Sequence, residues 1–254
     1  MNLLEGKTAI ITGASSGIGA AAARLFARHG AKLVINARRE GPLGEVAQEI
    51  AAKGGAVSAV AGDVRDEELH RRLVETAIRT FGRLDVALNN AGSLGEMGPA
   101  ESVSVEGWRE TLDINLTGGF LAAKHQLPAM LKGGGGSMIF TATFVGHVLG
   151  FPGMAAYGAA KAGLIGLMRV IAAEYAARDV RVNALLPGGV DTPMGREGAG
   201  SPEGLEFVKS IHAMKRIATP EEIAQSALYL ASDMSSFITG TALLADGGVT
   251  ISRT

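Results

Sequence analysis

Short apolar runs alternate with longer segments of helical periodicity along almost the whole chain. The apolar runs occupy residues 8–12, 32–36, 57–61, 86–90, 137–141, 181–186 and 241–245. They are largely apolar throughout and do not alternate with polar residues, which is typical of strands buried on both faces of a parallel sheet. We therefore expect an α/β fold, doubly wound, in which about seven parallel strands are flanked by helices on both faces.

Length and composition limit what such a fold can do. With 254 residues, 47% of them hydrophobic, the chain can bury one large core, and we expect a single domain over residues 1–254. A net charge of −1 gives no field that would attract nucleic acid or an anionic membrane, so neither is expected as a partner. No uninterrupted apolar run reaches the ~18 residues of a membrane span, and the N-terminal segment lacks the apolar run of a signal peptide, which predicts a cytoplasmic location. The chain has no cysteine and its five histidines lack metal-ligand spacing, so we expect neither disulfides nor a metal site.

A glycine-rich loop joins the first expected strand to the first expected helix. Gly13 would permit a tight turn off the strand, Gly17 would let backbone amides approach a pyrophosphate, and Gly19 would let the helix pack closely on the sheet. The helix N-terminus adds free N–H groups and a partial positive charge. The loop therefore predicts a dinucleotide site, and its other members in that site are Ser15, Ser16 and Ile18. The Gly-x-x-x-Gly-x-Gly spacing differs from the general Gly-x-Gly-x-x-Gly fingerprint.

Tyr157 and Lys161 are four residues apart in a segment with helical composition, which places a phenol and an ammonium on one helix face. A phenol ordinarily titrates near pH ~10, and a neighbouring cation favours the phenolate and lowers its pKa. Taken alone, such a pair is common on helices. Downstream of a dinucleotide loop it becomes a candidate for acid/base catalysis.

Four motifs in this order resemble the short-chain dehydrogenase/reductase family, and the resemblance covers nearly the whole chain. They are Thr12-Gly-Ala-Ser-Ser-Gly-Ile-Gly19, Asn89-Asn90-Ala91-Gly92, Tyr157-x-x-x-Lys161 and Pro187-Gly188. The resemblance implies a Rossmann fold and an oxidoreductase that moves hydride between a nicotinamide and a carbonyl or secondary-alcohol carbon.

The resemblance also implies roles for particular residues. Tyr157 would be the acid/base that exchanges a proton with the substrate oxygen, and Lys161 would bind the nicotinamide ribose and lower the pKa of the phenol. Asn115 is similar to the family's helix asparagine that holds a water in a proton relay; the alternative is a polar residue that kinks or caps a helix. The remaining implied cofactor contacts are Asp63 and Val64 for adenine, Asn90, Ala91 and Gly92 near the adenosine ribose, and Pro187, Gly188, Val190 and Thr192 for the nicotinamide carboxamide.

One position departs from the family pattern. The family places a serine thirteen residues before the tyrosine, where its hydroxyl stabilises charge on the reacting oxygen, and here that position is Phe144. Either the hydroxyl is lost, or the segment 144–152 carries one extra residue and Thr143 takes the serine's place, which we favour. Thr141 is the next candidate. His147 could also reach a substrate, although a surface loop histidine is the favoured interpretation.

The end of the second strand bears on the choice of cofactor. An acidic residue near Ala37 would bind the ribose 2′-hydroxyl of NAD and repel a 2′-phosphate, and here it is absent. Arg38 and Arg39 follow, and guanidinium groups suit phosphate oxygens. We therefore expect NADP(H) to be preferred over NAD(H). Ser15, where some NADP-preferring relatives carry a basic residue, does not add to this preference.

The glycine-rich stretch 193–216 reads as irregular and is expected to form a substrate lid, followed by a helix that begins at a Thr219–Glu222 capping box. An apolar substrate pocket could be formed by Leu94, Met97, Phe144, Phe151, Met194, Phe207, Ile211 and Met214. Long helices with more small and apolar residues than one buried face needs, together with the resemblance, predict a homotetramer.

Three functions fit the sequence. The leading one is the NADP(H)-preferring oxidoreductase just described, acting on a small carbonyl or alcohol. The second is a catalytically impaired dinucleotide-binding sensor or scaffold, which Phe144 would favour if it filled the place of the serine hydroxyl. The third is a methyltransferase on a related sheet, which would leave the tyrosine and lysine pair unexplained.

Overall fold

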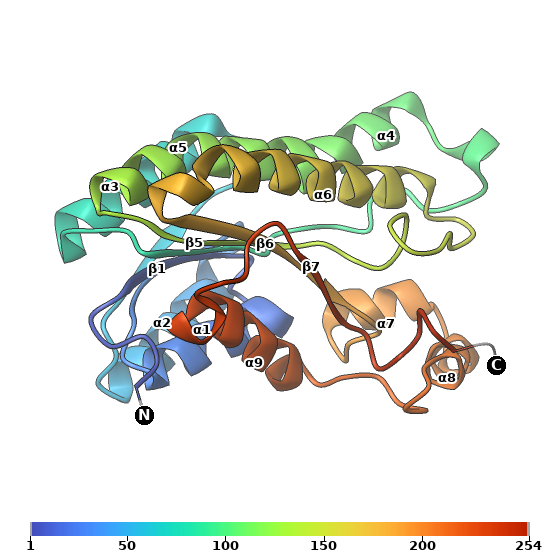
Figure 1. Ribbon diagram of the computed structural model, residues 1–254. Helices are drawn as coiled ribbons and strands as arrows, with labels where there is room; N and C mark the ends of the chain where they lie inside the picture. The colour runs from blue at the N-terminus through green and yellow to red at the C-terminus, as the bar shows by residue number, and fades with distance from the viewer. Residues whose placement is uncertain (1, 253–254) are drawn as a thin grey trace.

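The computed structural model describes residues 2–252. Its centre is a seven-stranded sheet in the order β3-β2-β1-β4-β5-β6-β7, with every neighbouring pair parallel (Figure 1). The strands are β1 Thr8–Thr12, β2 Lys32–Ala37, β3 Val57–Ala61, β4 Val86–Asn89, β5 Gly136–Thr141, β6 Val180–Pro187 and β7 Ala242–Ala245. The seven predicted strands are therefore confirmed, with differences of one residue at several ends.

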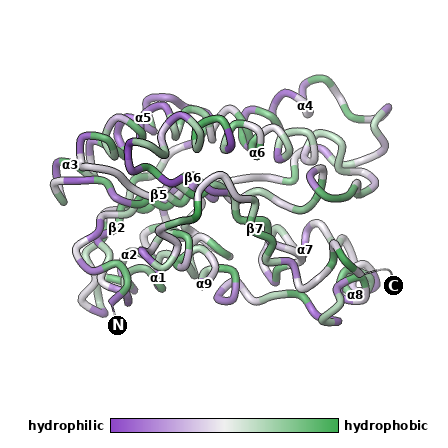
Figure 2. Tube along the Cα trace, in the orientation of Figure 1, coloured by the Kyte–Doolittle hydropathy of each residue, from purple (hydrophilic) through white to green (hydrophobic). Residues whose placement is uncertain are grey.

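Two helical layers cover the sheet. One face carries α3 (Glu67–Phe81), α4 (Val105–Leu112), α5 (Gly118–Lys132) and α6 (Ala155–Tyr175). The other face carries α1 (Gly17–Arg28), α2 (Glu40–Ala52) and α9 (Pro220–Ala231) (Figure 1). Ile10 and Ile11 are neighbours on β1 and belong to different apolar cores, one on each face. This two-sided burial is what the continuous apolar runs predicted, and Figure 2 shows the hydrophobic residues following the strands.

The expected long helix around residues 108–131 is interrupted. A π-helical turn at Asp113–Thr117 separates α4 from α5. Within this turn Asn115 Nδ2 donates to the Thr111 carbonyl at 2.9 Å, so the side chain binds a carbonyl one turn earlier in the chain. Single π turns inside α-helices occur frequently at functional sites.

The stretch predicted to be irregular contains two short helices, α7 (Pro193–Ala199) and α8 (Pro202–Ile211). Each begins with a hydroxyl residue followed by proline: Thr192 accepts a hydrogen bond from Gly195 N, and Ser201 accepts one from Gly204 N. The same signal recurs at α9, where the predicted capping box of Thr219 and Glu222 is confirmed. The prediction of irregular structure was thus wrong for this segment, because its glycines outweighed the two caps in the sequence argument.

Among the described residues, the segment Ala155–Arg178 is long and apolar enough to cross a membrane by length and composition alone. It comprises α6 and the 3₁₀ turn Ala176–Arg178 that follows it. More than half of its most apolar window is buried in the fold, where α6 packs against β6. The core helix of a folded sheet protein satisfies the same test, so the segment is weak evidence for a membrane span.

Candidate active site

A cleft of about 600 Å³ runs along the carboxyl ends of the strands. It crosses the point between β1 and β4 where the strand order reverses, which is the usual ligand site of an open parallel sheet. The sequence-predicted residues that line it are Gly13, Ser15, Ser16, Gly17, Ile18, Arg38, Arg39, Asp63, Val64, Asn90, Ala91, Gly92, Asn115, Thr143, Tyr157, Lys161, Pro187, Gly188, Val190 and Thr192. Gly19 lies in the first turn of α1, beneath the loop.

The glycine loop is shaped for close approach of a ligand. Gly13 and Gly17 have φ of 68° and 52°, in the left-handed region that favours glycine. A Cβ on Gly17 would lie 2.9 Å from Thr192 Cγ2, across the cleft, and one on Gly19 would lie 2.3 Å from the Gly13 carbonyl oxygen. Ser16 is the N-cap of α1 and its side chain makes no capping hydrogen bond, so it does not occupy the first-turn amides of a helix that begins at the cleft. The loop therefore fits a dinucleotide pyrophosphate, as its spacing predicted.

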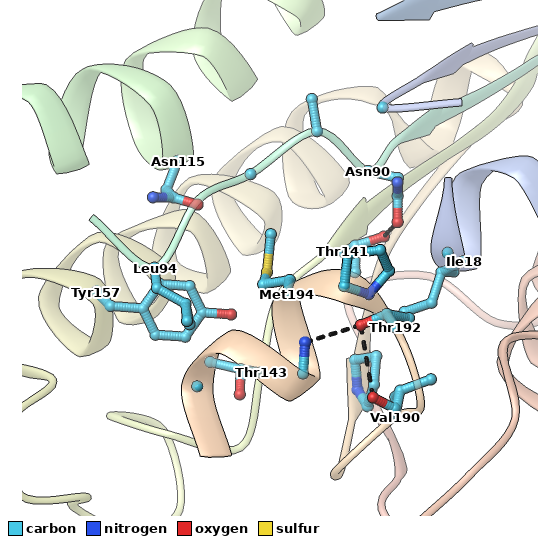
Figure 3. A pocket seen from close by; sticks show the side chains of 18 of the residues that line it. Ile18, Asn90, Leu94, Asn115, Thr141, Thr143, Tyr157, Val190, Thr192 and Met194 are labelled. Atoms are coloured by element: carbon cyan, nitrogen blue, oxygen red, sulfur yellow. Dashed lines mark hydrogen bonds between the residues drawn. The ribbon is translucent and has the colours of Figure 1, made fainter. Parts of the chain in front are cut away.

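A polar network fixes the chain that follows β4. Thr12 Oγ1 accepts hydrogen bonds from the backbone N–H groups of Asn90 at 3.0 Å and Ala91 at 3.1 Å. The Asn90 side chain donates to the Thr12 carbonyl at 3.2 Å and accepts from Thr141 Oγ1 at 3.2 Å (Figure 3). The side chain of Asn90 thus ties the end of β4 to β1 and β5.

Lys161 lies one helical turn after Tyr157 on α6 and is buried beneath it. Its Nζ donates to the Thr141 carbonyl at 2.8 Å and lies 5.9 Å from the centre of the Tyr157 ring. Burial lowers the pKa of Lys161 from 10.5 to about 8. A Cβ on Gly92 would approach Nζ to 3.3 Å, so the glycine leaves room for the ammonium at the floor of the cleft.

The pKa of Tyr157 departs from the sequence expectation. We expected Lys161 to lower it, whereas burial raises it from 10.0 to about 12 and the nearby Thr143 side chain opposes that rise. The physical reason is that desolvation penalises the phenolate, while the Lys161 ammonium is directed at the Thr141 carbonyl. The protein groups by themselves therefore do not lower the pKa of Tyr157, contrary to the expectation from the sequence.

Thr143 is the hydroxyl residue that lies near Tyr157 in the cleft. Its side chain is close enough to oppose the rise in the pKa of the phenol, and both residues line the cleft (Figure 3). Phe144 is 8% exposed and packs in an apolar cluster with Val145 and Val249, so it does not take the place of the hydroxyl. The Thr141 hydroxyl is committed to Asn90. His147 is exposed and is absent from the described lining of the cleft, in agreement with the favoured surface interpretation.

Asn115 is held firmly by backbone groups. Its Nδ2 donates to the carbonyls of Ser93 and Thr111, both at 2.9 Å, and its Oδ1 accepts from Ser93 N at 3.2 Å. Both amide protons are therefore engaged. The side chain secures the chain that follows β4 against the π turn, and its only remaining capacity to hold a water is a lone pair on Oδ1.

At the far end of the cleft, Asp63 is held by Arg65. The guanidinium contacts both carboxylate oxygens, at 2.8 Å and 3.1 Å, and lowers the pKa of the carboxyl, with a smaller contribution from the charge of Arg38. Any adenine contact by the Asp63 side chain would have to share the carboxylate with Arg65. Within residues 2–252, Arg38 and Arg39 form no salt bridge, which leaves both guanidinium groups available to a ligand.

His212 is a cleft residue that the sequence argument missed. It is 1% exposed, its Nδ1 donates to the Val208 carbonyl at 2.6 Å, and its Nε2 accepts from Gly189 N at 2.9 Å. It thereby joins the end of α8 to the segment after β6 that holds Gly188. Because both partners are backbone groups, no side-chain motif in the sequence could have indicated it.

The Thr192 hydroxyl already has a partner in the structure. It caps α7 by accepting a hydrogen bond from Gly195 N at 2.9 Å, so a nicotinamide contact would have to share this hydroxyl.

Of the residues expected to form the substrate pocket, Leu94, Phe144, Phe151, Met194 and Ile211 line the cleft. Met97, Phe207 and Met214 are exposed and lie outside the described lining. Phe207 instead contacts Phe151, with 6.5 Å between ring centres, and so links α8 to the β5–α6 connection.

Comparison with known proteins agrees with this geometry. The family model described as enoyl-(acyl carrier protein) reductase matches residues 13–250. Cyclohexanol dehydrogenase of Acinetobacter sp. (strain SE19) is 39% identical over 98% of this chain and 97% of its own length. The 2,5-dichloro-2,5-cyclohexadiene-1,4-diol dehydrogenase of Sphingobium indicum is 42% identical over 98% of this chain and 99% of its own.

A solved structure extends the likeness to three dimensions. A Beutenbergia cavernae protein, provisionally assigned as an NAD(P)-dependent gluconate 5-dehydrogenase and solved with NADP at low occupancy, superposes with a TM-score of 0.92. It is 39% identical and covers 99% of both chains. The chain belongs to the short-chain dehydrogenase/reductase family. It is accordingly an NAD(P)-dependent oxidoreductase that acts on CH–OH groups.

Proposed function

We propose that this protein interconverts a secondary alcohol and its ketone, with Tyr157 as acid/base and a preference for NADP(H) over NAD(H). The observation that carries the proposal is the placement of Tyr157 and Thr143 together in the lining of the cleft, with buried Lys161 one helical turn from Tyr157. A bound nicotinamide would supply the hydride acceptor in oxidation and the hydride donor in reduction.

Each of these three residues has a defined task in the proposed reaction. In alcohol oxidation, Tyr157 accepts the proton of the substrate hydroxyl while the carbon that bears this hydroxyl gives up its hydride. In reduction, Tyr157 donates a proton to the carbonyl oxygen. The Thr143 hydroxyl holds the reacting oxygen and stabilises its charge. The buried ammonium of Lys161 would hold the cofactor ribose and would supply positive charge beneath the phenol.

The proton step is tested by Tyr157→Phe, which keeps the ring and removes the hydroxyl. Turnover should fall by ~10²–10⁴-fold, the usual contribution of a positioned acid or base. Cofactor affinity, measured by fluorescence titration of the nicotinamide, should stay within about threefold of wild type. Turnover at the wild-type rate in this variant would show that the assignment is wrong. Cofactor binding with no turnover by the wild type on any alcohol or ketone would favour the sensor or scaffold instead.

The cofactor preference is supported by the end of β2. Ala37 is 7% exposed and presents no carboxylate to a 2′-phosphate, and Arg38 lies beside it without a salt-bridge partner among the described residues. Titrating both cofactors against wild type and Arg38→Leu tests this directly. The variant should lose ~10-fold or more in NADP affinity and change little for NAD, since only NADP carries the additional phosphate. Tighter binding of NAD than NADP by the wild type would refute the preference.

We also propose a homotetramer. Trp108, Phe120 and Val170 are large apolar side chains that remain 39%, 49% and 57% exposed on α4, α5 and α6. Burial of such side chains against another copy would remove apolar surface from water. Light scattering that finds only monomer at micromolar concentration would refute the assembly.

A further inference from the structure

The substrate end of the cleft lies beyond Tyr157 and Thr143, and its walls are apolar. The chain after β4, the β5–α6 connection and the helices α7 and α8 all contribute. The principal side chains are those of Leu94, Phe144, Phe151, Met154, Met194 and Ile211. Phe144 and Leu94 are each 8% exposed, so these two side chains of the wall are packed into the fold.

The ionisable groups that line the described cleft lie elsewhere or are already bound. Arg38, Arg39 and Asp63 are at the ends of β2 and β3, where the adenosine would lie. Lys161 lies beneath Tyr157 and is bonded to the Thr141 carbonyl.

His212 and the charged residues of α7 and α8 also provide no cation that could pair with a charged substrate at this end of the described cleft. Both ring nitrogens of His212 are occupied by backbone groups. Arg196 on α7 and Lys209 on α8 form salt bridges with Asp191 and Glu206. A carboxylate or phosphate on the substrate would therefore be desolvated without a cation to pair with it, which is strongly unfavourable.

The polar groups at this end serve one substrate oxygen. The side chains of Tyr157 and Thr143 both line the cleft at this end, where the reacting oxygen would lie. Further hydroxyls on a substrate would face the methionine and aromatic side chains and lose their hydrogen bonds to water. The contact between Phe151 and Phe207 brings α8 against the β5–α6 connection and encloses the site further.

Building on the proposed function, we propose that this site selects uncharged, mostly hydrocarbon substrates that carry a single secondary alcohol or ketone, such as alicyclic rings. It discriminates against the same skeleton bearing a carboxylate, and against polyols. Met194 sits in the apolar wall and is the position where a cation would change this selectivity.

The test compares two ketones that share one ring: cyclohexanone and 4-oxocyclohexanecarboxylate. Each is titrated by calorimetry into wild-type protein saturated with NADP⁺, so that binding is measured without turnover. Cyclohexanone should bind at least ~30-fold more tightly, because burying an unpaired carboxylate is unfavourable. Met194→Arg should narrow this ratio by ~10-fold or more through charge pairing, whereas the uncharged control Met194→Gln should not.

Equal or tighter binding of the carboxylate, or failure of cyclohexanone to bind at all, would overturn the substrate proposal. The proposed reaction is judged separately, by turnover of cyclohexanone with NADPH. Selective binding without turnover would support the apolar substrate site and refute the proposed catalysis. Turnover of cyclohexanone without selective binding would support the proposed catalysis and refute the apolar substrate site.

Discussion

Replacing Thr143 with valine removes the hydroxyl that we propose holds the reacting oxygen, and it nearly preserves the shape of the side chain. In the structure this side chain lines the cleft near Tyr157, and its hydroxyl accepts a hydrogen bond from Val145 N at 3.3 Å. Removing one donor that stabilises charge on a reacting oxygen lowers kcat by ~10²–10³-fold, or about 2.7–4 kcal/mol. The lost contact to Val145 N should lower the free energy of unfolding by only about 1 kcal/mol, since that bond is long.

The assay is steady-state ketone reduction with NADPH, alongside chemical denaturation. Thr143→Ser keeps the hydroxyl and is the matched control, so it should retain activity within about tenfold of wild type, with any loss arising from its freer rotamers. Adding Phe144→Ser to Thr143→Val should not restore activity, because Phe144 packs in the cluster with Val145 and Val249. A Thr143→Val protein with wild-type kcat, or rescue by the serine at 144, would refute the assignment of the hydroxyl.

Three other perturbations test separate parts of the structure. In the free protein Lys161 should titrate near pH 8 by NMR, because burial lowers its pKa from 10.5 to about 8. Lys161 then loses its proton at lower pH in the native state than in the unfolded chain, so the free energy of unfolding should rise with pH between about 8 and 10.5. A titration of Lys161 near 10.5 would contradict this. His212→Phe removes the link between α8 and Gly189 N, so KM for the substrate should rise several-fold and the unfolding free energy should fall by about 1–3 kcal/mol; an unchanged KM would show that the link does not order α8 at the cleft. Thr219→Ala removes the α9 capping box and should cost about 1 kcal/mol in denaturant unfolding, with kcat unchanged; no loss of stability would count against the cap.

The sequence was informative where function depends on backbone periodicity and on residues in fixed order. Continuous apolar runs such as residues 8–12 predicted β1, and the glycines at 13, 17 and 19 predicted a loop whose Cβ positions are indeed blocked. Features that depend on contacts between distant segments were not predictable. Asn115 lies in a π turn and donates to the carbonyls of Thr111 and Ser93, and no local pattern specifies the pairing with Ser93.

The electrostatics of the site were harder still to predict. The spacing of Tyr157 and Lys161 places both on one helix face, yet it does not reveal that Lys161 is directed at the Thr141 carbonyl or that burial dominates the pKa of the phenol. The role of Thr143 was inferred from an assumed insertion, and its place beside Tyr157 in the cleft depends on the folded β5–α6 connection. Desolvation and long-range backbone partners are properties of the assembled cleft.

The central claim is that this cleft transfers hydride from a carbinol carbon to a nicotinamide. The direct measurement uses cyclohexanol deuterated at that carbon with NADP⁺, followed by mass spectrometry of the reduced cofactor. The structure predicts reduced cofactor that is heavier by one deuterium, with its formation largely lost in Tyr157→Phe. Reduced cofactor without the label, or labelled cofactor formed equally fast by Tyr157→Phe, would contradict the proposed reaction at this site.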